Sequence, residues 1–113
     1  MNTYLNFKLV GVNLNWEIKE DLVRLACTLN KTVANYDYQT MYLKDNTNLE
    51  TYLIKLDDDE FIQFNIRREI REARLYICLR GTNYTSVAQT VEDFIMRVYR
   101  PERIKLQVRY SYN

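Results

Sequence analysis

The residues best suited to chemistry are ten basic side chains in the second half of the chain. Residues 61–113 contain ten Lys or Arg against five Asp or Glu, whereas residues 1–60 contain six against ten. Arginine forms bidentate contacts with carboxylate and phosphate groups, and tyrosine adds a ring for stacking. The sequence therefore predicts a local binding surface made by Arg67, Arg68, Arg71, Arg74, Arg80, Arg97, Arg100, Arg103, Lys105 and Arg109 with Tyr76, Tyr99, Tyr110 and Tyr112.

Three uses of this predicted surface remain open. The arginines can be solvated or paired with the acidic half of the chain. They can contact another protein, or they can bind nucleic-acid phosphates while the tyrosines stack on bases. The formal net charge of only +1 is unlike that of a domain that binds nucleic acid through phosphates. We therefore expect a protein partner or a second copy of the chain, with nucleic acid as the alternative.

A run of four carboxylates, Asp57 to Glu60, supplies oxygen atoms of the kind that Mg²⁺ and Ca²⁺ prefer. Adjacent residues of a strand point to opposite faces, and an EF-hand loop instead places its ligands at alternate positions around a glycine. The run therefore predicts a solvated hairpin turn. Whether it binds a divalent ion is left open.

The chain contains no histidine, which excludes catalysis by imidazole and zinc sites that depend on it. It has only two glycines, too few for the glycine-rich loops that hold nucleotide phosphates. Cys27 and Cys78 lie in separate apolar segments without a partner that would activate them, so both are predicted to be reduced core residues. We expect neither enzymatic activity nor a cofactor or metal.

The hydrophobic periodicity indicates which elements carry these residues. Alternation over Thr3 to Val12 predicts a strand, and an apolar stripe from Ile18 to Val33 predicts a helix over Trp16 to Lys31 with Asn15 as its N-cap. Trp16, the one tryptophan, is interpreted as a packing residue of the core or its rim rather than an interface anchor.

The middle of the chain alternates between apolar runs and polar turns. Strands are predicted over Tyr36–Lys44, Tyr52–Leu56, Phe61–Arg67 and Leu75–Leu79, as an antiparallel meander. Gly81, Thr82 and Asn83 break the sheet. A second helix follows with a capping box of Ser86 and Gln89, and it ends at Pro101. Alternation from Ile104 to Tyr112 predicts the last strand.

The expected fold is a single α+β domain over residues 1–113, in the order β-α-β-β-β-β-α-β. We expect a largely antiparallel sheet of about six strands with both helices on one face, and polar, tyrosine-bearing side chains on the other. No run of about 18 apolar residues predicts a membrane span, and we expect a cytoplasmic protein. Together these features predict a small, non-catalytic protein-interaction module, such as a regulator or inhibitor of a phage or mobile element, with homodimerisation as a further expectation.

Overall fold

A computed structural model describes residues 1–57, 59–81 and 84–111. The elements follow in the order β1 (Asn2–Val10), α1 (Ile18–Thr28), β2 (Asn35–Tyr42), β3 (Asn48–Lys55), β4 (Phe61–Arg67), the short 3₁₀ helix η1 (Arg68–Ile70), β5 (Glu72–Arg80), α2 (Tyr84–Val98) and β6 (Arg103–Ser111). This order confirms the predicted one. Asp58, Thr82, Asn83 and Tyr112, which the sequence analysis assigned to turns and to the last strand, lie outside the described residues.

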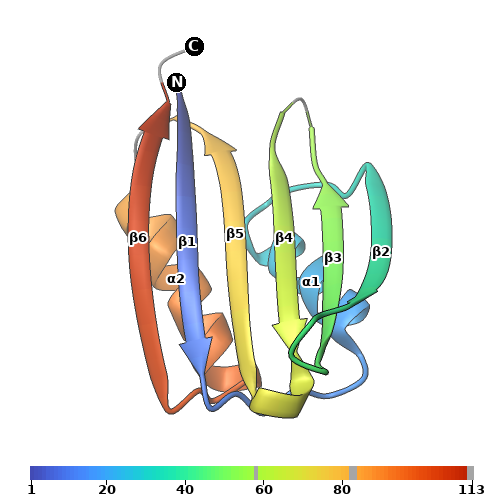
Figure 1. Cartoon of the computed structure of the whole chain (residues 1–113). Coiled ribbons are helices and arrows are strands. Elements are labelled where there is room, and N and C mark those ends of the chain that lie inside the picture. The colour runs from blue at the N-terminus through green and yellow to red at the C-terminus, as the bar shows by residue number, and fades with distance from the viewer. Residues whose placement is uncertain (58, 82–83, 112–113) are drawn as a thin grey trace.

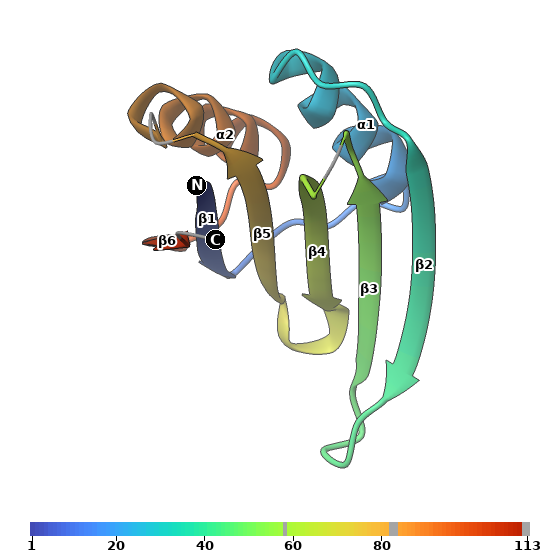
Figure 2. The same ribbon diagram turned by 90° about the horizontal axis from the view of Figure 1, so that it is seen from above.

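The six strands form one sheet in the order β2-β3-β4-β5-β1-β6, and every neighbouring pair is antiparallel. Both helices lie on the same face of this sheet, as predicted (Figures 1 and 2). The first strand is an internal one, because β1 inserts between β5 and β6. The N-terminal strand therefore lies between the last strand of the β-meander and the C-terminal strand, which forms one edge of the sheet.

The hydrophobic core fills the space between the sheet and the two helices. Alternate residues of each central strand point into it, such as Leu5, Phe7 and Leu9 of β1, all at most 2% exposed. The stripes of the helices close the core from the other side, through residues such as Leu22 and Val91. Removing this apolar area from water is the main driving force for the layered arrangement.

The predicted helix starts are wrong by about half a turn in opposite directions. Helix α1 begins at Ile18 rather than Trp16, and Asn15 does not cap it. Instead, the Oδ1 atom of Asn15 accepts a hydrogen bond from the backbone N–H of Glu17 at 2.8 Å. Helix α2 begins at Tyr84, so Ser86 lies inside the helix and no capping box forms there. The cap residues expected from the sequence therefore do not mark the first residue of either helix.

The burial of three side chains also differs from the predictions. Trp16 is 84% exposed, because it precedes α1 and the core closes without it. Cys27 is exposed on α1, whereas Cys78 is buried as predicted, and both thiols are free. Tyr99 was predicted for the binding surface but is fully buried. It follows α2 directly, where the chain turns back beneath the helices, and its ring packs against Phe64 at 5.2 Å between centroids.

None of the helices in the described part of the chain combines the length and apolar character needed to cross a membrane.

Candidate functional site

The face of the sheet that the helices leave open carries a row of four chemically distinct side chains. Residues that lie directly opposite one another on neighbouring antiparallel strands point to the same face. The register pairs Cys78 of β5 with Phe61 of β4 on one side and with Tyr4 of β1 on the other. Tyr4 in turn pairs with Arg109 of β6. The row therefore reads Phe61, Cys78, Tyr4 and Arg109.

A second row lies two residues further along each strand. Tyr76 of β5 is paired with Gln63 of β4 and with Asn6 of β1, and Asn6 is paired with Gln107 of β6. This row therefore consists of one aromatic ring among three amides. The two rows together place rings, amides, a thiol and a guanidinium on one continuous patch of the sheet.

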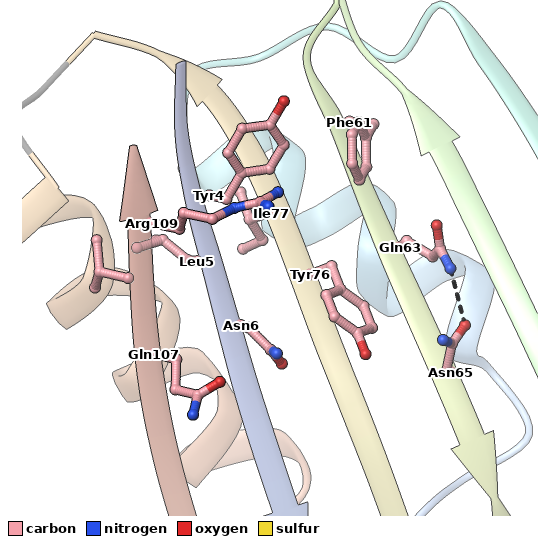
Figure 3. Close-up of a pocket in the computed structure, with 11 residues that line it drawn as sticks. Tyr4, Leu5, Asn6, Phe61, Gln63, Asn65, Tyr76, Ile77, Gln107 and Arg109 are labelled. Atoms are coloured by element: carbon pink, nitrogen blue, oxygen red, sulfur yellow. Dashed lines mark hydrogen bonds between the residues drawn. The ribbon is translucent and has the colours of Figure 1, made fainter. Parts of the chain in front are cut away.

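The members of the two rows other than Cys78, which is buried, line a hollow with a volume of about 920 Å³. Its walls include the side chains of Tyr4, Asn6, Phe61, Tyr76 and Arg109, which come from four different strands (Figure 3). This volume lies within the usual range for sites that bind small molecules, which is about 300–1,000 Å³. We call this feature the open-face hollow.

Arg109 places a positive charge at one side of the open-face hollow. Its guanidinium lies over the Tyr4 ring, 4.7 Å from the centroid, which is a cation–π arrangement. In the described ranges of the chain, no carboxylate forms an ion pair with Arg109. Its charge is thus available for an anionic group of a ligand.

The amides of the open-face hollow include atoms whose hydrogen-bonding capacity the described residues do not use. Gln63 Nε2 donates to Asn65 Oδ1 at 3.2 Å, which holds this pair in a fixed orientation (Figure 3). Asn6 Oδ1 is buried and accepts no hydrogen bond from any described residue. A buried acceptor without a donor costs about 1–3 kcal/mol. A ligand that donates to Asn6 would recover part of that cost.

Cys78 brings a thiol to the base of this face. Burial raises the pKa of the Cys78 thiol above its ordinary value, and its hydrogen bond with Tyr4 offsets part of the rise. The carboxylates of Glu60 and Asp59 raise this pKa further, and the charge of Arg109 lowers it slightly. The thiol therefore stays protonated at neutral pH, and little thiolate is present to act as a nucleophile.

The structure divides the predicted binding surface among several places. Of its members, Tyr76 and Arg109 line the open-face hollow. Arg74, Arg103 and Lys105 belong to the same open face but lie outside the hollow, whereas Tyr110 pairs with buried Thr3 and contacts Tyr84 on the helix side.

The remaining predicted residues lie at the sheet ends. Arg67 binds Asp45 and Thr47 at the end of β4, and Arg80 ends β5. A second group gathers beyond η1 and α2, namely Arg68, Arg71, Arg97 and Arg100. The structure therefore does not bring the predicted residues together on one surface, because the second half of the sequence contributes to several sides of the fold.

Sequence reasoning missed most of the open-face hollow. The polar and aromatic lining residues it did not name are Tyr4, Asn6, Phe61, Gln63, Asn65 and Gln107. Their signal was present, since each occupies the polar phase of a strand whose other phase is apolar. What was missing was the order of the strands, which alone places these residues side by side.

The acidic run differs from the predicted solvated turn at its last residue. Glu60 is only 5% exposed and accepts two hydrogen bonds from the Lys31 ammonium group at 3.0 Å. It also accepts one from the backbone N–H of Arg80 at 3.0 Å. Within residues 1–57, 59–81 and 84–111, no cluster of three or more potential metal-ligating side chains occurs. Glu60, which directly precedes β4, therefore joins the segment that follows α1 to the end of β5.

Comparison with known proteins shows that the fold of this chain is similar to the fold of an enzyme. No family model and no curated protein matches the sequence. Among solved structures, the adenosylmethionine decarboxylase from Aquifex aeolicus is similar, with a TM-score of 0.75 and 21% sequence identity. The similarity covers 96% of this chain and 88% of that one. At this identity, what the comparison shows is the fold.

This finding contradicts the predictions of a non-catalytic interaction module and of a protein that is not an enzyme. Those predictions rested on the missing histidine and on the missing glycine-rich loops. These absences remove particular mechanisms and leave catalysis by other groups untouched. Nearly the whole chain adopts the fold of an adenosylmethionine decarboxylase.

Proposed function

We propose that the chain is an enzyme whose substrate is adenosylmethionine or a close chemical relative, bound in the open-face hollow. The observation that supports this proposal is the pair of rows across β4, β5, β1 and β6. They bring rings, amides and a guanidinium that forms no ion pair with a described residue to one hollow of suitable size, with the Cys78 thiol adjoining it in the first row. Each of these groups has a counterpart in such a substrate.

The rings suit the adenine and sulfonium groups. Phe61, Tyr76 and Tyr4 stand on three adjacent strands and line the same hollow (Figure 3). A purine gains about 1–3 kcal/mol by stacking on an aromatic side chain. A sulfonium cation is likewise attracted to the face of an aromatic ring.

The amides suit the hydrogen-bonding edge of adenine. Asparagine and glutamine can bind N6 and N7 of adenine with two hydrogen bonds at once. Asn6 offers an acceptor that no described residue uses, which matches the amino group at N6. Gln107, on the neighbouring strand in the same row, offers a further amide.

Arg109 suits the carboxylate of the methionine moiety. A guanidinium and a carboxylate form short, charge-assisted and often bidentate hydrogen bonds. Because Tyr4 stacks against Arg109, the guanidinium is already oriented before a substrate arrives. Such prior ordering lowers the entropic cost of binding.

Cys78 is the candidate proton donor. Its register position lies between Phe61 and Tyr4, and the raised pKa keeps its proton in place at neutral pH. A protonated group that adjoins the substrate hollow can serve a reaction that leaves an electron pair on a substrate atom. The name of the structural neighbour, a decarboxylase, describes a reaction of this class.

Binding of adenosylmethionine, measured by isothermal titration calorimetry, tests the proposal. We expect a saturable heat with the wild-type chain, and a loss of affinity of at least about tenfold in Arg109→Ala, because the carboxylate loses its partner. Arg103→Ala is the matched control, since Arg103 lies on the same strand and face but outside the hollow. Absence of binding to the wild type, or equal affinity in both variants, would refute the proposal.

A further inference from the structure

We propose that a second hollow binds a small molecule that carries two linked phosphate groups. This hollow has a volume of about 630 Å³ and lies beyond η1 and the end of α2. It is lined by Arg68, Arg71, Arg97 and Arg100, together with Trp16 and the segment that precedes it. We call it the arginine hollow. It shares no lining residue with the open-face hollow, so the inference does not depend on the function proposed above.

The arginine hollow carries an excess of positive charge. Arg68 is neutralised by Glu50, whose Oε2 lies 2.6 Å from its Nε. Arg71 has a looser partner in Glu102 at 3.9 Å, and both of these side chains are largely exposed. Within the described part of the chain, no ion pair involves Arg97 or Arg100. Two guanidinium groups therefore face one hollow without a counter-charge from the protein.

The backbone adds an independent observation. The described non-glycine residues with positive φ are Asn30, Asn46, Arg71 and Arg100. Asparagine is often found in the left-handed region, but arginine has no such preference and carries the usual steric cost. Both arginines, at φ 54° and 45°, line the arginine hollow. Both lie at the C-terminal end of a helix, η1 or α2, where a left-handed residue is a common way for a helix to end, so two helix ends bring these arginines to the hollow.

The two strained arginines are held in place by the chain around them. The backbone N–H of Arg71 donates to the carbonyl of Arg68 at 3.1 Å, and that of Arg100 donates to the carbonyl of Ile95 at 3.1 Å. Arg71 also donates from its side chain to the carbonyls of Gly11 and Val12. These contacts order the wall of the hollow before a ligand binds.

Trp16 offers a ring at the edge of the hollow. Its side chain is 84% exposed, and the Arg68 guanidinium lies 4.2 Å from the ring centroid. Arg68 is itself fixed by Glu50 and by the carbonyl of Asn15, which accepts a hydrogen bond from its Nη1 at 2.9 Å. The fluorescence of an exposed indole held in this way would respond to a change of charge in the hollow.

The charge and shape favour a diphosphate over a single carboxylate. Arginine binds phosphate oxygens in the same bidentate way as it binds carboxylates. Two unpaired guanidinium groups match an anion with charge on two neighbouring phosphates better than one with a single charge. A hollow of this volume also limits the ligand to a small molecule.

Fluorescence of Trp16 provides the test, because it is the one tryptophan of the chain. The full chain is titrated with pyrophosphate at constant ionic strength, and sulfate is the comparison anion. We expect a saturable change with pyrophosphate and a much weaker response to sulfate. Arg97→Ala should weaken the affinity for pyrophosphate by at least about tenfold.

Arg100→Gly is the sharper variant, because it removes a guanidinium and at the same time relieves the positive φ. Its fold should be retained, and its affinity for pyrophosphate should also fall by at least about tenfold. Arg74→Ala, an exposed arginine on the open face of β5, should bind like the wild type.

Three results would overturn the inference: no saturable change with pyrophosphate, equal responses to pyrophosphate and sulfate, or wild-type affinity in both Arg97→Ala and Arg100→Gly. A failure of the function proposed above is distinguishable from these, since Arg109→Ala should bind pyrophosphate unchanged.

Discussion

The Tyr99 hydroxyl donates a hydrogen bond to Oδ2 of Asp21 at 3.1 Å, and both side chains are buried. Asp21 belongs to α1 and Tyr99 follows α2, so this bond joins the two helices beneath which the core lies. The Tyr99 ring also packs against Phe64 and Phe94. One residue thus ties the second helix to the first helix and to the sheet.

Tyr99→Phe should lower the free energy of unfolding by about 2 kcal/mol. The ring contacts remain, but the buried Asp21 carboxyl loses its hydrogen-bond partner. Urea unfolding followed by circular dichroism measures the change. Tyr84→Phe, in an exposed tyrosine of α2, is the matched control and should change stability little. If both variants match the wild type, the bond between Tyr99 and Asp21 contributes nothing to stability.

Stability should fall as the pH rises above about 10, the ordinary pKa of tyrosine. Burial raises the pKa of Tyr99 and of Tyr52, and neighbouring Asp21 and Glu50 raise them further. The folded chain therefore keeps these protons where the unfolded chain has released them. Since the folded state then binds more protons, each further rise in pH favours unfolding.

The urea midpoint measured against pH tests this dependence. Tyr99→Phe should make the alkaline decline shallower, because one buried hydroxyl no longer resists ionisation. Tyr84→Phe should leave the slope of the wild type unchanged. An alkaline slope that is identical in all three proteins would contradict the assignment to Tyr99.

The two cysteines should react at different rates with a thiol reagent. Cys27 is exposed, whereas Cys78 is buried and its pKa is raised, so little thiolate forms there. The native chain should show one fast thiol, and Cys27→Ser should remove that phase. Saturating adenosylmethionine should slow the remaining reaction of Cys78 further, because the ligand would cover the open-face hollow. A fast phase that survives in Cys27→Ser would show that Cys78 is accessible.

Gly11→Ala should destabilise the fold by about 1–2 kcal/mol, because Gly11 has a φ of +71°. A Cβ there would also lie 2.6 Å from the carboxyl group of Glu102, whose exposed side chain can swing away. Backbone strain should therefore dominate. Chemical denaturation of Gly11→Ala/Glu102→Ala against Glu102→Ala should still show most of the loss. Complete recovery in the double variant would mean that the contact with Glu102, not the backbone, sets the cost.

The sequence was sufficient to predict the element order and the open face, because alternation with period two and stripes at helical spacing are local properties. The polar phases of β1 and β6 already marked Asn6 and Gln107 as side chains that point away from the core. Cap positions were less well predicted. Asn15 and Ser86 carried reasonable signals, but the helices begin at Ile18 and Tyr84 instead.

The candidate site could not be predicted in the same way. Arg109 and Phe61 are 48 positions apart, and only the insertion of β1 between β5 and β6 brings their strands to one hollow. Strand order depends on long-range pairing and on how the apolar faces close against the helices, neither of which leaves a local pattern. For the same reason, charge counted along the chain predicted one arginine surface where the fold makes several.

The sequence by itself thus determined which alternate residues of the strands face the core, and it excluded the catalytic mechanisms whose side chains the chain lacks. The tertiary structure decided which polar residues become neighbours: Tyr4 with Cys78 and Arg109 on the open face, and Trp16 with Arg68 at the end of the molecule. The physical reason is that burial of apolar side chains acts on every strand separately, whereas a binding site needs side chains from several strands in register.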